Sequence, residues 1–189
     1  MHLILASASA RRAELLESAG FSFDVAPSDV DETVHDGETP KAYALRVARD
    51  KAAVAWEQCR KSGKVVLAAD TVVVAAGQIL AKPEGREDAR RMLKTLSGAV
   101  HEVHTAVVVR SGHREVSDVI TSRVRLLPLS DAEIDWYIGT GEPEGKAGGY
   151  AIQGRAARFI DWLEGSWSNV VGLPVSTVYR LLREVGECD

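Results

Sequence analysis

Residues 65–80 have the sequence VVLAADTVVVAAGQIL, an apolar stretch that contains a turn signal at Gly77. Because β-branched residues dominate its first part, we expect a strand over Val65–Ala76 and a return strand over Gln78–Leu80. Such a hairpin places two antiparallel strands side by side. A chain that combines this hairpin with helices is expected to form a mixed α/β fold, not a strictly alternating parallel sheet.

The segments around this hairpin show helical and strand patterns in turn. Helix starts are marked by capping residues, Thr39 before Pro40 and Ser130 in a capping box with Glu133, and several helix ends are marked by glycine. We expect helices from about Ser9 to Gly20, from Thr39 to about Gly63, over Arg86–Leu96, from Ser130 onward and from Pro174 to about Val185, with further strands over Phe21–Val25, Glu102–Arg110 and Glu115–Leu127.

The composition limits the class of protein. The 189 residues carry a formal net charge of −4 and are 46% hydrophobic, which fits a single folded domain over residues 1–189. An acidic balance disfavours binding to nucleic acid, which needs a basic surface. Cys59 and Cys188 are far apart, which indicates a reducing compartment, although one bridge between them stays open.

The chain has no segment that indicates a membrane or export. No apolar run is long enough to span a bilayer, and no cationic region precedes the short apolar run near the N-terminus. We therefore expect a cytoplasmic protein that does not associate with a membrane.

Asp70 is the most unusual residue of the apolar stretch. It lies inside a run that is otherwise hydrophobic. Because burying an unpaired carboxylate is costly, Asp70 is expected to be paired, bound to a metal, or at a strand end that faces a cleft. The alternative is an aspartate at an edge or a bulge that faces water, and we favour the functional interpretation.

Two lysines and a glutamate are further candidates. Lys51 falls with Val47 and Val54 on the apolar face of its predicted helix, so it either extends to the edge of that face or reaches into a site. Lys82 follows the hairpin and is either a surface lysine or a neighbour of Asp70 at one rim. Glu32 lies in the acidic loop 27–38 and is either solvated or available to a divalent cation, which prefers oxygen ligands.

The N-terminal segment combines a short strand pattern with hydroxyl and basic residues. A helix that begins after this strand offers N–H groups and the positive end of its dipole to an anion. The alternative is an ordinary capped helix with solvated arginines. The side chains that would add donors and charge to a phosphate site are those of Ser7, Ser9, Arg11 and Arg12.

The sequence does not support a histidine metal site or a P-loop. His101 and His104 are three apart in a predicted strand entry, so they lie on opposite faces and do not form a metal site. The absence of a GxxxxGK[ST] loop argues against a P-loop nucleotide enzyme.

Eight strings of residues, spread over nearly the whole chain, are more specific together than any one alone. They are LASASARRAELL at 5–16, SDVDE at 28–32, RVARDKA at 46–52, AADTVV at 68–73, AKP at 81–83, LSGAVHEVHTAV at 96–107, KAGGYAIQG at 146–154 and GSWSNVVGLP at 165–174. In this order they resemble the Maf family of nucleoside triphosphate pyrophosphatases.

The resemblance implies a fold and an activity. The family fold is similar to that of inosine-triphosphate pyrophosphatases, a long twisted mixed sheet with flanking helices and two lobes about a cleft. The activity is hydrolysis of a nucleoside triphosphate to the monophosphate and pyrophosphate with a divalent cation, Mg²⁺ or Mn²⁺. We expect Asp70 to act as general base or metal ligand, Glu32 to help hold the cation, and substrate contacts from Ser7, Ser9, Arg11, Arg12, Lys51, Thr71, Lys82 and Gln153.

The resemblance also implies a choice of substrate. One subgroup of the family acts on dTTP and UTP, and another prefers methylated GTP. The first typically carries DT at the catalytic strand and Gln in the string IQG, as this chain does at 70–71 and 152–154. The chain is therefore similar to the dTTP/UTP subgroup, with modified pyrimidine nucleotides as further candidates, and the positions linked to base choice are Arg11, Thr71 and Gln153.

One departure from the family pattern is visible. Ala10 stands where the family usually has proline before the two arginines. Proline at a first helical position is preorganised but not required, so we expect a slightly looser loop and no loss of a donor.

Two other functions stay open at this point. One is a nucleotide-binding regulator of cell division without significant turnover, and the other is a nucleic-acid-binding module, which the acidic balance disfavours. The expected partner is the nucleoside triphosphate substrate. The oligomeric state is not readable from the sequence, and a homodimer stays open.

Overall fold

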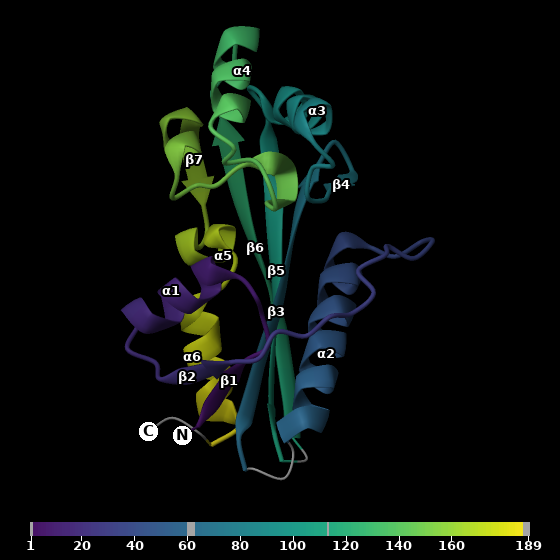
Figure 1. Cartoon of the computed structure of the whole chain (residues 1–189), viewed down its shortest axis with the longest axis vertical. Coiled ribbons are helices and arrows are strands. Elements are labelled where there is room, and N and C mark those ends of the chain that lie inside the picture. The colour runs from purple at the N-terminus through teal and green to yellow at the C-terminus, as the bar shows by residue number, and fades with distance from the viewer. Residues whose placement is uncertain (1, 60–62, 113, 187–189) are drawn as a thin grey trace. The chain divides into compact units, whose positions relative to one another are not determined.

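The computed structural model describes residues 2–59, 63–112 and 114–186, and Figure 1 shows the course of the chain. The chain divides into two compact units. The first contains the residues up to Thr71, Thr105–Ile120 and the residues from Gly172 on, and the second contains Val72–His104 and Thr121–Val171. Whether they are lobes of one domain over residues 1–189 stays a prediction.

The strands of the described residues form one seven-stranded mixed sheet in the order β2-β1-β3-β5-β6-β7, with β4 paired to β3. β1 (Leu3–Leu5) pairs in parallel with β2 (Phe23–Val25) and with β3 (Val65–Ala75). β3 pairs antiparallel with β4 (Gln78–Leu80), which is the predicted hairpin. The predicted mixed α/β class is thus confirmed.

The first unit contains three helices, α1 (Ala10–Ser18), α2 (Pro40–Cys59) and α6 (Val175–Glu184). In Figure 1, α2 lies on one side of the strands of this unit, and α1 and α6 lie on the other. Apolar residues of α2 recur at helical spacing and are fully buried, among them Val47, so the burial of this face stabilises the unit.

The second unit contains the elements that lie wholly within Val72–His104 and Thr121–Val171, whereas β3, β5 and β6 run through both units. In this unit, α3 (Arg86–Leu96) packs against α4 (Asp131–Gly139), and β6 pairs antiparallel with β7. Tyr137 on α4 is fully buried and meets the ring of Phe159 edge to face. The other bounds are β5 (Val100–Ser111), β6 (Arg114–Leu126), η1 (Ala147–Gly149), η2 (Arg155–Phe159), β7 (Ile160–Glu164) and α5 (Trp167–Val171).

The structure contains both of the predicted helix caps. The Thr39 hydroxyl accepts from the N–H of Ala42, and the Ser130–Glu133 capping box is complete. Ser9 precedes α1, and its side chain makes no capping hydrogen bond. The backbone N–H of Ser9 donates to the Ser7 hydroxyl at 3.2 Å.

Three smaller expectations have different outcomes. Val54 was expected on the apolar face of α2 but lies at its margin and is 38% exposed. The pairing of Cys59 with Cys188 stays untested because residue 188 lies outside the described residues. Within the described residues, none of the helices has the length and apolar character needed to cross a membrane.

Candidate functional site

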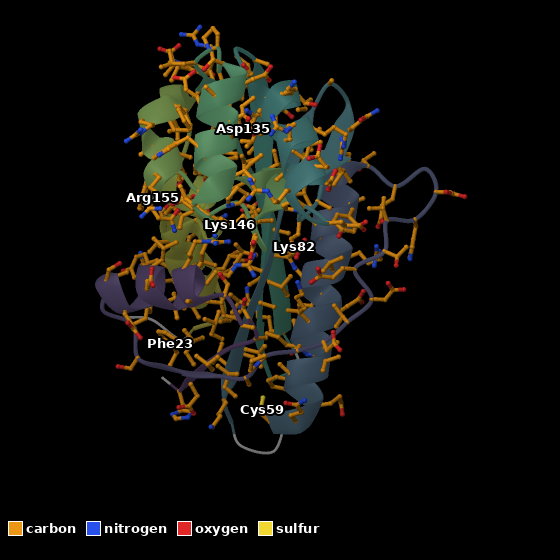
Figure 2. The ribbon with its side chains drawn as sticks, turned by 45° about the horizontal axis from the view of Figure 1, so that its top comes forward. Phe23, Cys59, Lys82, Asp135, Lys146 and Arg155 are labelled. Carbon is orange, nitrogen blue, oxygen red and sulfur yellow. The ribbon has the colours of Figure 1, made fainter. Side chains whose placement is uncertain are left out.

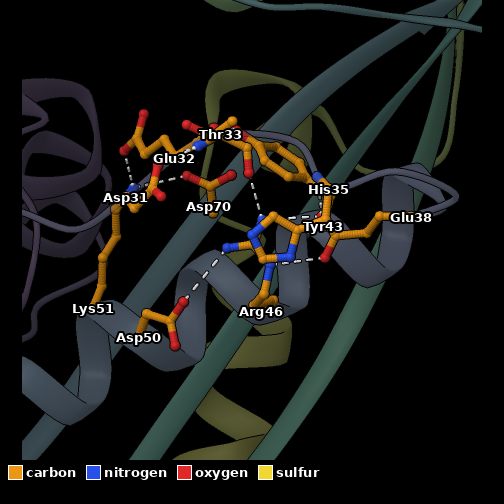
Figure 3. A network of polar contacts seen from close by, with 10 residues as sticks. All are labelled: Asp31, Glu32, Thr33, His35, Glu38, Tyr43, Arg46, Asp50, Lys51 and Asp70. Atoms are coloured by element: carbon orange, nitrogen blue, oxygen red, sulfur yellow. Dashed lines mark hydrogen bonds and ion pairs between the residues drawn. The ribbon is translucent and has the colours of Figure 1, made fainter.

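An ion-pair cluster, buried at Lys51 and Asp70 and exposed at Glu32, lies where α2 faces β3 in the first unit (Figure 3). Lys51 on α2 and Asp70 on β3 are both 8% exposed, and Lys51 Nζ donates to Asp70 Oδ1 at 2.8 Å. The same ammonium lies 2.6 Å from Glu32 Oε1. Lys51 therefore reaches into the site, and the carboxylate inside the apolar strand is paired, as the sequence predicted.

The loop that carries Glu32 is fastened to α2. Tyr43 donates its hydroxyl to the carbonyl of Glu32 at 2.8 Å, and burial, together with the charges of Asp70 and Glu32, raises the pKa of Tyr43 to about 12. Arg46 donates to the carbonyl of Thr33 at 2.8 Å. The loop is thus anchored on the helix, so the position of Glu32 follows from its neighbours.

A second anchor of this loop is the pair Arg46–Glu38. Arg46 Nε and Nη2 donate to the two carboxylate oxygens of Glu38 at 2.8 and 3.0 Å, a bidentate arrangement. This hydrogen bonding lowers the pKa of Glu38 to about 2. The pair stays ionised at neutral pH and holds the end of the loop next to α2.

Arg12 at the start of α1 is buried and bound to three protein oxygens. Its Nε donates to the carbonyl of Gly172 at 2.8 Å, Nη1 to Ser7 Oγ at 3.0 Å and Nη2 to Thr71 Oγ1 at 3.1 Å. Burial lowers the pKa of Arg12, and the charge of Asp70 opposes this. Part of the donor capacity of Arg12 is therefore used inside the protein, where it joins the segment after β1, the strand β3 and the segment before α6.

Thr71 continues the same network on β3. Its hydroxyl lies 2.9 Å from Thr105 Oγ1 on β5 and 3.3 Å from the carbonyl of Gly172. Gly172 has φ +125°, a backbone conformation that side-chain-bearing residues rarely adopt. The motif string that contains Gly172 was recognised in the sequence, but the roles of Gly172 and Thr105 were missed because only the folded chain brings them to Thr71.

The predicted substrate residues divide between the two units. Lys82 follows β4 in the second unit and is exposed, as is Gln153, which lies just before η2. Figure 2 labels Lys82, and the carbonyl of its neighbour Ala81 accepts from the N–H of Gly148 at 3.1 Å. The proximity of Lys82 to Asp70 stays a prediction. The first unit brings together Ser7, Arg12, Glu32, Lys51, Asp70 and Thr71, with Ser9 and the partly exposed Arg11 on the adjoining turn of α1.

The donor set suits a hard divalent cation. The carboxylates of Glu32 and Asp70 both contact the Lys51 ammonium, so their oxygens lie close together. Mg²⁺ commonly binds one or two carboxylates together with phosphate oxygens. Within the described part of the chain, no group of three or more His, Cys, Asp or Glu side chains could hold a metal ion. The residues therefore fit a cation that arrives with a phosphate ligand better than a dedicated protein cage.

Comparisons with known proteins extend this picture. Residues 2–185 match the family described as "Maf-like protein". A relative from Anaeromyxobacter dehalogenans (strain 2CP-C), named dTTP/UTP pyrophosphatase, is 52% identical over 97% of this chain and 94% of its own length. Another of that name, from Geotalea uraniireducens (strain Rf4), is 49% identical over 100% of this chain and 97% of its own.

One solved structure adds only a weak likeness. It is a nucleoside-triphosphatase / dITP/XTP pyrophosphatase from Mycobacterium abscessus, which covers 98% of this chain and 95% of its own at 15% identity. The TM-score of 0.43 is too low to support an argument about this chain.

Proposed function

Because this chain belongs to the Maf-like protein family, we propose that it hydrolyses dTTP and UTP to the nucleoside monophosphate and pyrophosphate. Relatives that are 49% and 52% identical carry the name dTTP/UTP pyrophosphatase, and the likeness covers nearly the full length of both chains. Within the chain, the observation that carries the proposal is the Lys51 ammonium between Asp70 and Glu32.

Asp70 is the proposed general base. It takes a proton from a water molecule whose oxygen attacks the α phosphorus. The bond from that phosphorus to the oxygen bridging to the β phosphorus breaks, and pyrophosphate leaves with the electron pair. Lys51 supports this role by fixing the carboxylate through Oδ1, since an oriented base in a partly dry site is more effective than a mobile one.

The phosphate chain is proposed to bind to the basic and hydroxyl side chains around Asp70. Arg11 lies on the first turn of α1 and is partly exposed, so we assign it to direct phosphate or base contact. Arg12 is bound to three protein oxygens, and we assign it to holding the site in shape in addition to phosphate contact. The other proposed phosphate contacts are Ser7, Ser9 and Lys51 in the first unit and Lys82 in the second.

A divalent cation, Mg²⁺ or Mn²⁺, is part of the proposal. Glu32 and Asp70 would hold it, since both carboxylates contact the Lys51 ammonium and therefore lie close together. When bound, such a cation neutralises charge on the phosphates. If Asp70 binds the cation, it acts as a metal ligand instead of as the general base.

Base choice is assigned to Arg11, Thr71 and Gln153. The Thr71 hydroxyl is oriented by Arg12 and Thr105, which gives it a fixed direction. The Gln153 amide offers both a donor and an acceptor, and a polar group left unpaired by the wrong base is penalised strongly. Modified pyrimidine nucleotides are included in the proposed substrates.

The test is a panel of nucleoside triphosphates with Mg²⁺ or Mn²⁺, in which pyrophosphate and orthophosphate are measured separately. We expect pyrophosphate as the first product, with dTTP and UTP turned over fastest. Orthophosphate as the first product would reject cleavage between the α and β phosphates. Tight nucleotide binding without turnover would favour the nucleotide-binding regulator instead.

A further inference from the structure

The Glu142 carboxylate, in the second unit, forms hydrogen bonds that hold the segment around Gln153 in place. Glu142 follows α4, is partly buried, and accepts from the N–H of Arg155 at 2.9 Å through Oε2 and from that of Ala156 at 3.3 Å through Oε1. These are the first N–H groups of η2, and such groups have no partner within their own helix. Glu142 thus caps η2 from a distance of 13 residues along the chain. Figure 2 labels Arg155 at the start of this short helix.

The same carboxylate reaches the other flank of Gln153 through a tyrosine. Tyr137 donates its hydroxyl to Glu142 Oε1 at 2.7 Å, and the hydroxyl oxygen accepts from the N–H of Ala151 at 3.2 Å. Tyr137 is fully buried, so this link lies in the core of the unit. The backbone is therefore fastened two residues before Gln153 and two residues after it, to one network.

Gly154 shows how closely the carboxylate approaches this segment. A Cβ at this position would lie 2.4 Å from Glu142 Oε1, far inside van der Waals contact. The N–H of Gly154 also donates to the carbonyl of Ala151 at 3.0 Å, which closes a tight turn around Gln153. A side chain at position 154 would force the Glu142 carboxylate to move away from this turn.

The network is charged at neutral pH. Burial raises the pKa of Glu142, but the N–H groups of Arg155 and Ala156 and the hydroxyl of Tyr137 outweigh burial and hold this pKa below its usual value. Burial and the hydrogen bond to Glu142 raise the pKa of Tyr137. A charged acceptor makes hydrogen bonds that are about twice as strong as neutral ones, so the turn is held firmly.

We propose that Glu142 is a positioning residue for base selection, because it fixes from both sides the turn that presents Gln153. The proposal rests on the proposed function, in which Gln153 reads the base. A side chain that reads a base by hydrogen bonding discriminates only when its backbone is held in place, since the penalty for a wrong base depends on geometry. Glu142 itself touches no substrate in this account.

The experiment compares kcat/KM for UTP with kcat/KM for GTP. Glu142→Gln keeps the size of the side chain but turns an NH₂ group toward N–H donors, so it leaves at least one of them unpaired. We expect the UTP-to-GTP ratio to fall roughly tenfold, mainly through a higher KM for UTP, with a smaller change for GTP. Tyr137→Phe removes the hydroxyl that joins Ala151 to Glu142 but leaves the bonds from Glu142 to Arg155 and Ala156, so it is expected to act in the same direction with a smaller effect.

Two further variants separate positioning from general damage. Glu144→Gln alters an exposed carboxylate two residues away and is expected to keep the wild-type ratio. In a Gln153→Ala background, Glu142→Gln is expected to change the ratio no further, because the residue that it positions is gone. An equal loss of selectivity in both backgrounds, or a wild-type ratio in folded Glu142→Gln and Tyr137→Phe proteins, would overturn the proposal.

The failure of the proposed function has a different signature. If the wild-type protein releases no pyrophosphate from UTP, that function is wrong, and the same variants are then compared by their dissociation constants for UTP and GTP. A binding preference that Glu142→Gln weakens would still support the positioning role. A preference that both variants leave intact would reject it.

Discussion

The Asp70 carboxylate can be buried on a strand of the sheet because the Lys51 ammonium forms an ion pair with it. Without Lys51, the carboxylate would be buried among apolar neighbours with a large desolvation penalty. Glu32 shares the same ammonium, so a single lysine organises two acidic side chains that come from a strand and a loop. At the scale of single residues, the site is thus a small cluster in which each charge depends on its neighbours.

Replacing Asp70 tests its assigned role. Asp70→Asn keeps the size of the side chain but removes the proton acceptor, so we expect kcat for pyrophosphate release from dTTP to fall by roughly 10²–10⁴. Lys51 keeps its contact with Glu32, which favours a folded variant. Asp36→Asn, at an exposed loop position, serves as the control and is expected to behave as wild type. Near-wild-type pyrophosphate release from Asp70→Asn would exclude Asp70 as base and as essential metal ligand.

The segment between α5 and α6 matters at the scale of elements. Its Gly172 carbonyl receives Arg12 from α1 and Thr71 from β3, and its backbone has φ +125°. A Cβ there would meet Thr71 Oγ1 at 3.6 Å and Arg12 Nε at 3.8 Å, which are ordinary contacts. The constraint at this position is therefore backbone conformation, not space.

Gly172→Ala is expected to destabilise the protein by roughly 1–3 kcal/mol, because alanine must adopt a strained backbone or move the carbonyl. Chemical denaturation measures the loss, and activity should fall with it as Arg12 and Thr71 lose their acceptor. Gly139→Ala is the matched control, since Gly139 ends α4 without a positive φ and with nothing near its missing Cβ. Equal stability of the two variants would show that the backbone at Gly172 is not constrained.

His101 gives β5 a dependence on pH. It is 1% exposed, its Nε2 lies 2.7 Å from the hydroxyl of Tyr150, and burial lowers its pKa to about 4. The unfolded chain binds the proton more tightly, with a pKa near 6.5. The contribution of neutral, buried His101 to the free energy of unfolding is therefore complete above pH 6.5, and it is lost as the pH falls from 6.5 toward 4.

We expect this loss to reach about 3 kcal/mol between pH 6.5 and pH 4, measured as the free energy of unfolding. His101→Gln removes the titrating group and should flatten this part of the profile. His35→Gln, at an exposed position, should leave the profile unchanged. A wild-type slope in the His101→Gln protein would rule out His101 as its source.

Local patterns sufficed to predict much of the fold and part of the site. Helical periodicity put Lys51 on the buried face, and a partner was one of the arrangements expected for Asp70, but the sequence did not identify the two residues as partners. The contact of Arg12 with Gly172 could not be predicted, because it joins residues that are 160 positions apart in the sequence and forms only in the folded chain. The capping of η2 by Glu142 was hidden for the same reason, since nothing in the sequence near Gln153 points to it.

The charge of the whole molecule bears on its partners. A net charge of −4 leaves no excess of cations to release counterions from a nucleic-acid backbone. We expect no binding of duplex DNA or single-stranded RNA in fluorescence anisotropy at about 50 mM salt, where nonspecific electrostatic binding is strong. UTP should bind under the same conditions because its contacts are local. Micromolar binding of either polymer would contradict this expectation.

The bond between Arg12 and Gly172 also affects when the protein becomes competent during its synthesis. Ribosomes deliver the N-terminal residues first, and contacts between distant residues form late. Ser7, Arg12 and Thr71 emerge early, but their common acceptor is delivered only after the entire second unit has been made. A nascent chain that stalls before Gly172 thus carries nearly all of the site residues yet lacks the carbonyl that joins them, so the first unit to start is the last to be completed.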